Sequence, residues 1–157
     1  MLRDKLAKTM ECVEEKLIPY MEDERILQMK RFIQHGNTTT RDHVIRVARM
    51  AVMLDLLLPG NRDTDEICAA AVLHDYYLYD WHDHGDHLHG FHHPYIAAEN
   101  AKRDFCVSDH VCSMIKSHMW PLNFLEVPKS RGAWLITFSD KFISIQETVG
   151  GRLHFNK

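Results

Sequence analysis

The chain has 157 residues, of which 45% are hydrophobic and 26% charged, as in one soluble globular domain with a sizeable core. A net charge of -3 gives no electrostatic reason to expect binding to nucleic acid polymers or anionic membranes. No apolar stretch approaches the ~20 residues that span a bilayer, and the charged N-terminus lacks the apolar segment of a secretion signal. The cysteines are scattered without a C-x-x-C pair, which favours a reduced, cytoplasmic protein. They are Cys12, Cys68, Cys106 and Cys112.

Two amphipathic helices are predicted at the start of the chain. The first covers residues 3–17, and Pro19 is expected to end it. The second covers residues 22–34, and Gly36 is available for a left-handed C-cap. We expect residues 3–34 to pack on a helical core of about residues 34–148, within a single domain that covers residues 1–157.

A long helix is predicted from about residue 40 to residue 58. Thr39 and Asp42 resemble a capping box at its start. His43 shares one stripe of this helix with Val47 and later apolar residues, so its imidazole is expected to face inward. A single inward histidine is ordinarily a core residue with a satisfied hydrogen bond, and the turn at residues 59–61 ends the helix.

The next predicted helix carries the central feature of the sequence, the dipeptide His74-Asp75. Asp63 or Thr64 can cap this helix, and its apolar run at residues 67–73 leads directly into the dipeptide. A buried histidine beside a buried aspartate costs several kcal/mol unless the carboxylate is neutralised, and a metal ion does this directly. The alternative is a histidine at the helix end with a solvated aspartate.

Half of the 12 histidines fall between His82 and His93. The loop of residues 82–92 follows an aromatic segment at residues 76–81, which either surrounds a site or belongs to an ordinary core. His82, His84 and His87 are interpreted as solvated loop residues. Pro94 suits the first position of a helix that runs to about Phe105, and this places His93 at the helix entrance.

Two more helices complete the chain. Ser108 caps the first, His118 lies near its C-terminal end and Pro121 stops it. The second runs over about residues 131–149, with Asp140 in its middle, and the pair Gly150-Gly151 is expected to end it. Its apolar residues are Trp134, Leu135, Phe138, Phe142 and Ile145. No hairpin or alternating strand is evident, so we predict an all-α bundle of six or seven helices.

Several histidines and aspartates thus lie near apolar helix faces or helix ends. Each would need its own buried partner if it acted alone, whereas a shared metal site satisfies all of them together. Imidazole and carboxylate are ligands common to Zn²⁺, Mn²⁺, Fe²⁺, Co²⁺ and Ni²⁺, and the absence of a thiolate argues against a structural zinc site. The set is His43, His74, Asp75, His93, His118 and Asp140.

The order His, His-Asp, Asp over residues 34–148 resembles the HD-domain superfamily of metal-dependent phosphohydrolases. The stretches at residues 90–94, 117–121 and 139–141 resemble those of a subgroup that binds a second metal. The resemblance implies that His43, His74, Asp75 and Asp140 bind one metal and that Asp75 bridges to a second. His93 and His118 would hold that second metal, with His89 and His92 as further candidates for the second site or its surroundings.

The resemblance also implies a reaction: two divalent ions activate a water as hydroxide, which attacks phosphorus in a small phosphomonoester or phosphodiester, a nucleotide among the candidates. The ions could be iron, manganese, zinc, cobalt, nickel or magnesium. Tyr76-Tyr77-Leu78 follows the His-Asp pair and no Gly-Tyr-Pro motif is present, which disfavours cleavage of cyclic dinucleotides. Candidate cations for the substrate are Arg46, Lys116 and Lys141. Asp80 is a candidate proton donor, although a cap at the end of its helix is the favoured interpretation.

Three alternatives stay open at the level of sequence. The same ligand types suit a di-iron pair that uses O₂ to cleave C–C or C–P bonds on this scaffold. A regulatory domain that binds a nucleotide without turnover is another, although no candidate ligand is missing. Metal storage by the histidine-rich loop would leave His43 and Asp140 unexplained. A homodimer through an apolar helix face such as that of residues 3–17 is also open.

Overall fold

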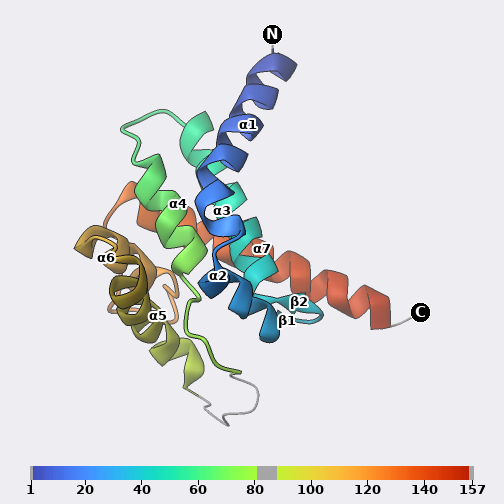
Figure 1. Ribbon diagram of the computed structural model, residues 1–157, viewed down its shortest axis with the longest axis vertical. Helices are drawn as coiled ribbons and strands as arrows, with labels where there is room; N and C mark the ends of the chain where they lie inside the picture. The colour runs from blue at the N-terminus through green and yellow to red at the C-terminus, as the bar shows by residue number, and fades with distance from the viewer. Residues whose placement is uncertain (1, 81–87, 156–157) are drawn as a thin grey trace.

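The computed structural model describes residues 2–80 and 88–155. Within these residues it is built from seven helices, a short 3₁₀ helix at Met29–Arg31 and two short strands (Figure 1). The all-α prediction is confirmed. The helices are α1 (Leu2–Met21), α2 (Glu24–Gln28), α3 (Thr40–Leu57), α4 (Thr64–Leu73), α5 (His89–Phe105), α6 (Asp109–Ser117) and α7 (Arg131–Phe155), and the strands are β1 (Ile33–His35) and β2 (Thr38–Thr39).

Helix α4 lies at the centre of the molecule. Every residue from Ile67 to Leu73 is buried, as expected for a helix that is apolar on all sides. It packs on α3, α6 and α7, and α3 also packs along α7. Small residues at the contacts, including Ala48 and Ala51 of α3 and Ala70 of α4, are fully buried and permit close approach of the helices. The end of α4, and with it His74-Asp75, is therefore fixed deep inside the bundle.

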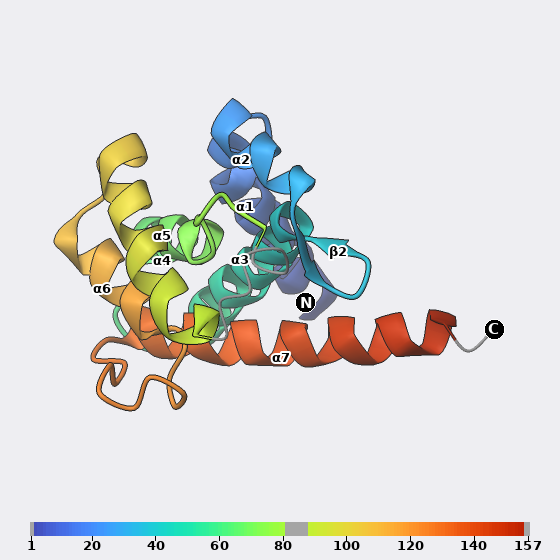
Figure 2. The same cartoon turned by 90° about the horizontal axis from the view of Figure 1, so that it is seen from below.

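The outer helices complete two sides of this centre. Helix α1 packs on α3 and α4 through the buried side chains of Val13 and Leu17. Helices α5 and α6 pack on each other on the opposite side (Figure 1). Helix α7 runs along one side of the bundle, and its C-terminal part extends beyond the other helices (Figure 2). Within the described residues no helix combines the length and apolar character needed to cross a bilayer.

The sequence placed two boundaries in the N-terminal region wrongly. Pro19 does not end the first helix, because α1 continues to Met21 with Pro19 in its exposed last turns, where a lost backbone hydrogen bond is replaced by water. The helix expected at residues 22–34 is shorter, since the chain becomes extended at Phe32 and forms an antiparallel hairpin, β1–β2. Gly36 does adopt a positive φ of 56°, but in the hairpin turn and not at a helix C-cap.

Two helix boundaries near the candidate site also differ from expectation. Helix α5 begins at His89, so Pro94 lies inside the helix and not at its first position. Helix α7 continues through Gly150 and Gly151 to Phe155, since glycine lowers helix stability by only about 1 kcal/mol relative to alanine. The caps predicted at Thr39 and Ser108 are confirmed, because each side chain accepts a hydrogen bond from the backbone N–H three residues later. His82, His84 and His87 lie outside the described residues.

The glycines of α7 provide a matched test of this packing. A Cβ added at Gly132 would lie 2.5 Å from Met114 Sδ and 2.7 Å from Ile67 Cγ1, whereas one at Gly150 meets nothing within 4 Å. Gly132→Ala should lower the free energy of unfolding by about 1–3 kcal/mol through overpacking. Gly150→Ala should raise it by up to about 1 kcal/mol through helix propensity. Chemical denaturation of both variants checks the pair, and a stabilised Gly132→Ala protein would contradict this packing.

Candidate metal centre

The imidazole of His74 is oriented by the end of its own helix. Its Nδ1 lies 2.7 Å from the carbonyl oxygen of Ala71. The last carbonyls of a helix have no partner in the helix itself, so Nδ1 carries the proton and donates to this oxygen. The opposite ring nitrogen, Nε2, is then a lone-pair acceptor. It is fully buried and has no hydrogen-bond partner.

His93 and His118 are held in the same way. His93 Nδ1 lies 2.9 Å from the carbonyl oxygen of His89, and His118 Nδ1 lies 2.7 Å from that of Ile115. Both rings are buried, and His118 follows the last residue of α6 as its C-cap. Local backbone carbonyls thus select the Nδ1–H tautomer in three imidazoles, and each Nε2 presents a lone pair.

His43 reaches the same state through a carboxylate. Its Nδ1 lies 2.8 Å from Glu147 Oε2, across 104 residues of sequence. Arg46 donates to the other oxygen of Glu147 at 3.0 Å. An ionised carboxylate only accepts hydrogen bonds, so Nδ1 donates and Nε2 again carries a lone pair. Glu147 is therefore an orienting carboxylate for His43, of the kind that supports metal-bound histidines.

Four of the candidate residues form a first group of converging acceptors. His43 Nε2 lies 3.2 Å from Asp140 Oδ1 and 3.7 Å from Asp75 Oδ2. His74 Nε2 lies 3.4 Å from Asp75 Oδ2 and 3.7 Å from Asp140 Oδ1. Helices α3, α4 and α7 each contribute to this group. Its members point at a common centre, as the sequence led us to expect.

A second group shares the carboxylate of Asp75. His93 Nε2 lies 3.1 Å from Asp75 Oδ1 and 3.0 Å from His118 Nε2. His118 Nε2 lies 3.7 Å from the same carboxylate oxygen, which has no hydrogen-bond partner. Asp75 therefore directs Oδ2 toward the first group and Oδ1 toward the second. Asp75 thus lies between the two groups, and its role as a bridge between two metals stays a prediction.

These atoms fit a metal site. Two donors that each lie about 2.1 Å from one cation are about 3.0 Å apart at a right angle and about 3.4 Å apart at the tetrahedral angle. The separations of 3.0–3.7 Å cover that range. Lone pairs that face one another in a buried space repel unless a cation or protons lie between them. The unpartnered His74 Nε2 and Asp75 Oδ1 are the atoms that a cation would satisfy.

The pKa values of the imidazoles show that protons can take the place of a cation in the first group but not at His118 in the second group. Burial alone would lower the pKa of His43, but Asp140 and Glu147 raise it to about 9. Burial opposes the charge on His74 as well, yet Asp75 and Asp140 raise its pKa to about 10. For His118, burial holds the pKa well below its usual value, and the nearby His74 lowers it further.

The two carboxylates remain ionised despite their burial. Desolvation favours the protonated acid, but His74 and the other imidazoles hold the pKa of Asp75 well below its usual range. For Asp140, His43 and His74 have the same effect on the pKa against the same desolvation. Two buried carboxylates at neutral pH are the anionic ligands that a divalent cation requires.

A polar network fixes Asp75 from the hairpin side. Gln34, at the centre of β1, donates from Nε2 to Asp75 Oδ2 at 2.6 Å. Its carbonyl oxygen accepts hydrogen bonds from the hydroxyls of Tyr77 and Thr40. Because two hydroxyl groups donate hydrogen bonds to that oxygen, the amide N–H must face Asp75. Gln34 therefore holds the carboxylate in its bridging orientation.

Lys141 lies at the edge of the centre. Its ammonium donates to Asp140 Oδ2 at 2.8 Å and to the carbonyl oxygen of His118 at 3.0 Å. Ser144 donates to Asp140 Oδ1 at 3.2 Å. The side chain of Lys141 is 38% exposed, so this cation connects the buried groups to solvent.

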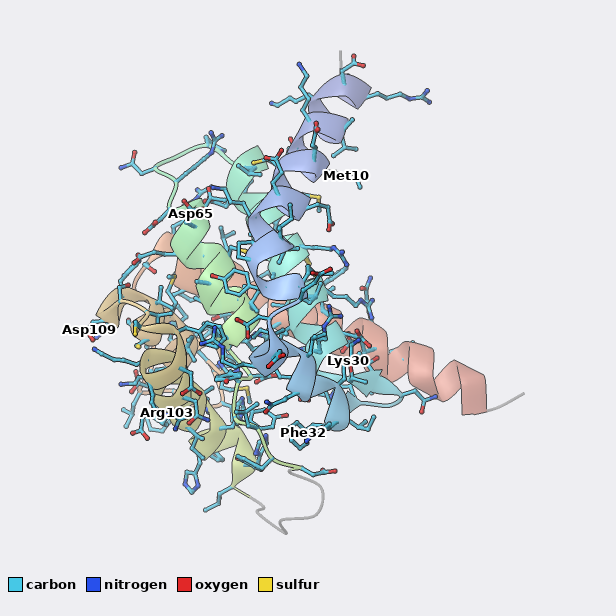
Figure 3. The ribbon with its side chains drawn as sticks, viewed as in Figure 1. Met10, Lys30, Phe32, Asp65, Arg103 and Asp109 are labelled. Carbon is cyan, nitrogen blue, oxygen red and sulfur yellow. The ribbon has the colours of Figure 1, made fainter. Side chains whose placement is uncertain are left out.

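The remaining sequence candidates lie outside the converging groups of the described residues. Asp80 is half-buried in the segment after α4. Lys116 acts electrostatically on Asp109, which lies on the outer edge of α6 (Figure 3). His92 is exposed. His89 is buried, stacks on His93 with ring centroids 4.6 Å apart and is paired with the hydroxyl of Tyr79, so it borders the second group.

Sequence reasoning missed three residues around the centre. Glu147 lies two helical turns after Asp140 on the same inward face of α7, and this spacing could have revealed it. Gln34 was assigned to a helix end, so no pattern pointed to it. His35, also in the hairpin, packs its ring against that of His43 at 5.4 Å and lies with His43 and Glu147 in a further group of candidate ligands.

A comparison with protein families gives one match. The model of the HD domain matches residues 40–144, more than half of the chain. The chain belongs to the HD-domain family. Searches of curated proteins and of solved structures gave no match.

Membership in the HD-domain family agrees with the chemistry of the centre. HD domains bind divalent metals and are generally metal-dependent hydrolases. The matched range contains all six candidate ligands, including the His74-Asp75 pair at the end of α4. Gln34 and Glu147, which orient Asp75 and His43, lie outside that range.

The raised pKa values make metal binding depend on pH. At pH 7 the metal-free HD domain holds protons on His43 and His74, since their pKa values are about 9 and about 10. A cation must displace these protons, so its apparent affinity should rise by about tenfold or more per pH unit between pH 6 and pH 8. Calorimetry of Mn²⁺ or Zn²⁺ binding in buffers of different ionisation enthalpy measures the released protons. Binding without proton release would contradict this assignment.

The orienting role of Glu147 can be tested separately. Glu147→Gln keeps the size of the side chain, but its amide can donate to His43 Nδ1 and so favour the other tautomer. We expect metal affinity to fall by about 10–100-fold, as for other outer partners of metal ligands. The exposed neighbour Gln146 provides the control, since Gln146→Ala should leave the affinity unchanged. Equal affinities in both variants would show that the contact with His43 has no such role.

Proposed function

We propose that this HD domain is a dinuclear metal-dependent phosphohydrolase that cleaves a small phosphomonoester or phosphodiester. The observation that carries the proposal is the division of the acceptor atoms into two groups that share Asp75. One carboxylate oxygen faces each group. A single ion does not account for both groups, because the ring nitrogens of His93 and His118 lie beside Oδ1 and not beside Oδ2.

In this proposal each ion has its own set of ligands. His43, His74 and Asp140 would hold the first ion together with Asp75 Oδ2. His93 and His118 would hold the second together with Asp75 Oδ1. Divalent cations supply Lewis-acid chemistry when bound: they lower the pKa of water and neutralise charge on phosphoryl oxygens. Nitrogen and oxygen donors without thiolate suit iron, manganese, zinc, cobalt or nickel, and magnesium less well.

The chain supplies positive charge beside the centre. Lys141 is partly exposed and linked to Asp140, so its ammonium is the cation best placed to contact a phosphoryl oxygen. Arg46 has a different part in this arrangement, because its guanidinium binds Glu147, which orients His43. It therefore acts as a positioning residue. The assignment of Asp80 as proton donor to the leaving group stays a prediction.

The proposed substrate is a small phosphorylated molecule, with nucleotides as the first class to screen. A panel of nucleoside mono-, di- and triphosphates and generic aryl phosphates, each with Mn²⁺, Fe²⁺, Co²⁺, Ni²⁺, Zn²⁺ or Mg²⁺, covers these classes. Stoichiometric iron together with O₂ consumption on a phosphonate or polyol, and no phosphate release, would support the oxygenase alternative and overturn hydrolysis. Tight nucleotide binding without product would support a regulatory domain instead.

Two variants test the shared carboxylate and its neighbour. His74→Ala and Asp75→Asn should each lower phosphate release by more than about a hundredfold, the upper range for residues that merely support metal ligands. Asp75→Asn should also reduce the metal content below that of the parent protein, because both groups lose a charged ligand. Elemental analysis and circular dichroism establish metal content and folding. His92→Ala, at an exposed position of α5, is the control. Retained turnover in Asp75→Asn would rule out the shared role.

A further inference from the structure

Helix α7 has two apolar faces, of which the bundle covers one. The inward face is buried and carries Ala133, Ile136, Asp140, Ile143 and Glu147. The opposite face carries Trp134, Phe138, Phe142, Ile145 and Val149, whose side chains are 45%, 56%, 44%, 65% and 51% exposed. A helix that is apolar on both sides is ordinarily covered on both sides. Trp134 packs edge-on against Trp120 with ring centroids 5.1 Å apart, but the described residues leave about half of the surface of this outer face exposed.

The spacing of the outer face is that of a helix-pairing seam. Its apolar residues follow one another at intervals of four, four, three and four residues, close to the alternation of a and d positions in paired helices. We call this set the outer seam: Trp134, Phe138, Phe142, Ile145 and Val149. Stacking of Phe138 on Phe142, with ring centroids 6.3 Å apart, gives it a continuous aromatic centre. The occupant that this pattern fits is another α-helix.

The outer seam carries no unpaired charge. Residues 134–149 contain three charged side chains, and Asp140 and Glu147 are buried on the inward face. The third, Lys141, donates to Asp140 and to the carbonyl oxygen of His118. Identical seams can therefore approach each other without facing like charges.

The exposed apolar area is of the size that self-association uses. The exposures of the five outer residues correspond to roughly 500 Å² of side-chain surface, from the usual areas of such side chains. At Phe142 the seam continues into an apolar groove of about 380 Å³ between α1, α3 and α7, bounded on α1 by the exposed Met10 (Figure 3). Seam and groove together expose roughly 600 Å², which is the lower end of the area per partner in stable interfaces.

We propose that a second copy of this chain covers the outer seam, with the two α7 helices packed antiparallel about a twofold axis near Phe142. The shape of the seam supports this orientation. Antiparallel pairing places the bulky Trp134 of one copy near the small Val149 of the other and Phe138 near Ile145. Parallel pairing would put Trp134 against Trp134 and leave a gap between the valines. A twofold interface is self-complementary, so one seam suffices for both copies.

The oligomeric state of the full chain tests the proposal. Sedimentation equilibrium should give twice the chain mass for the parent protein. Phe142→Glu places a buried charge beside its own symmetry mate, and Ile145→Glu buries a charge against the apolar Phe138 of the other copy, so each should give a folded monomer, with at least a hundredfold weaker self-association. Phe124→Glu is the matched control, because Phe124 is 71% exposed and lies outside the seam. It should remain a dimer.

Each outcome is decisive. A monomeric parent protein, or two glutamate variants that stay dimeric, would overturn the proposal. Circular dichroism and metal content identify a variant that fails to fold, and Ile145→Glu, which does not line the groove, then decides. Orientation is tested in a Cys106→Ser background, since Cys106 is exposed. Phe142→Cys should form an intersubunit disulfide on oxidation and Val149→Cys should not. A disulfide in Val149→Cys as well as in Phe142→Cys would indicate parallel helices and overturn the antiparallel arrangement.

Discussion

The structure depends on the convergence of four imidazole lone pairs on the two oxygens of Asp75 and one oxygen of Asp140. Each of these atoms is an acceptor, and each is buried. Such an arrangement is costly by itself, because lone pairs that face one another repel and because His74 Nε2 and Asp75 Oδ1 lack hydrogen-bond donors. It becomes stable when positive charge lies among them. The helices of this HD domain therefore hold these atoms around a space that suits a cation, and in the first group protons on His43 and His74 can take its place.

The bundle orients most of these imidazoles through backbone carbonyl groups of its own helices. Carbonyls near helix ends orient His74 and His118, and a carbonyl one turn earlier in α5 orients His93. For His74 and His118 these carbonyls lie at a helix C-terminus, where they lack partners in the helix. His43, in the first turn of α3, pairs instead with the distant Glu147. One of the four imidazoles therefore depends on a carboxylate.

The sequence predicted the parts of the centre that follow from helical periodicity and from resemblance. His43 was recognised on an inward stripe, and His74-Asp75 at the end of an apolar run, and both are buried. The roles of Gln34 and the hairpin could not be predicted, because three residues of strand are too few to show an alternating pattern. The sequence also did not show that the outer seam faces away from the bundle, since its composition resembles that of a core face. Only packing distinguishes which apolar stripe of α7 meets the bundle.

The contact between His43 and Glu147 joins residues that are 104 positions apart, and Gln34 reaches Asp75 across 41. Contacts so distant in sequence carry a large loop-closure entropy, and they form after local helical structure. The centre is thus completed late, when α3 and α7 have docked. The ligands of the first group come from α3, α7 and the end of α4, so they converge only when these helices are packed together. Loss of the ions should then leave a bundle that keeps its topology and can be reloaded.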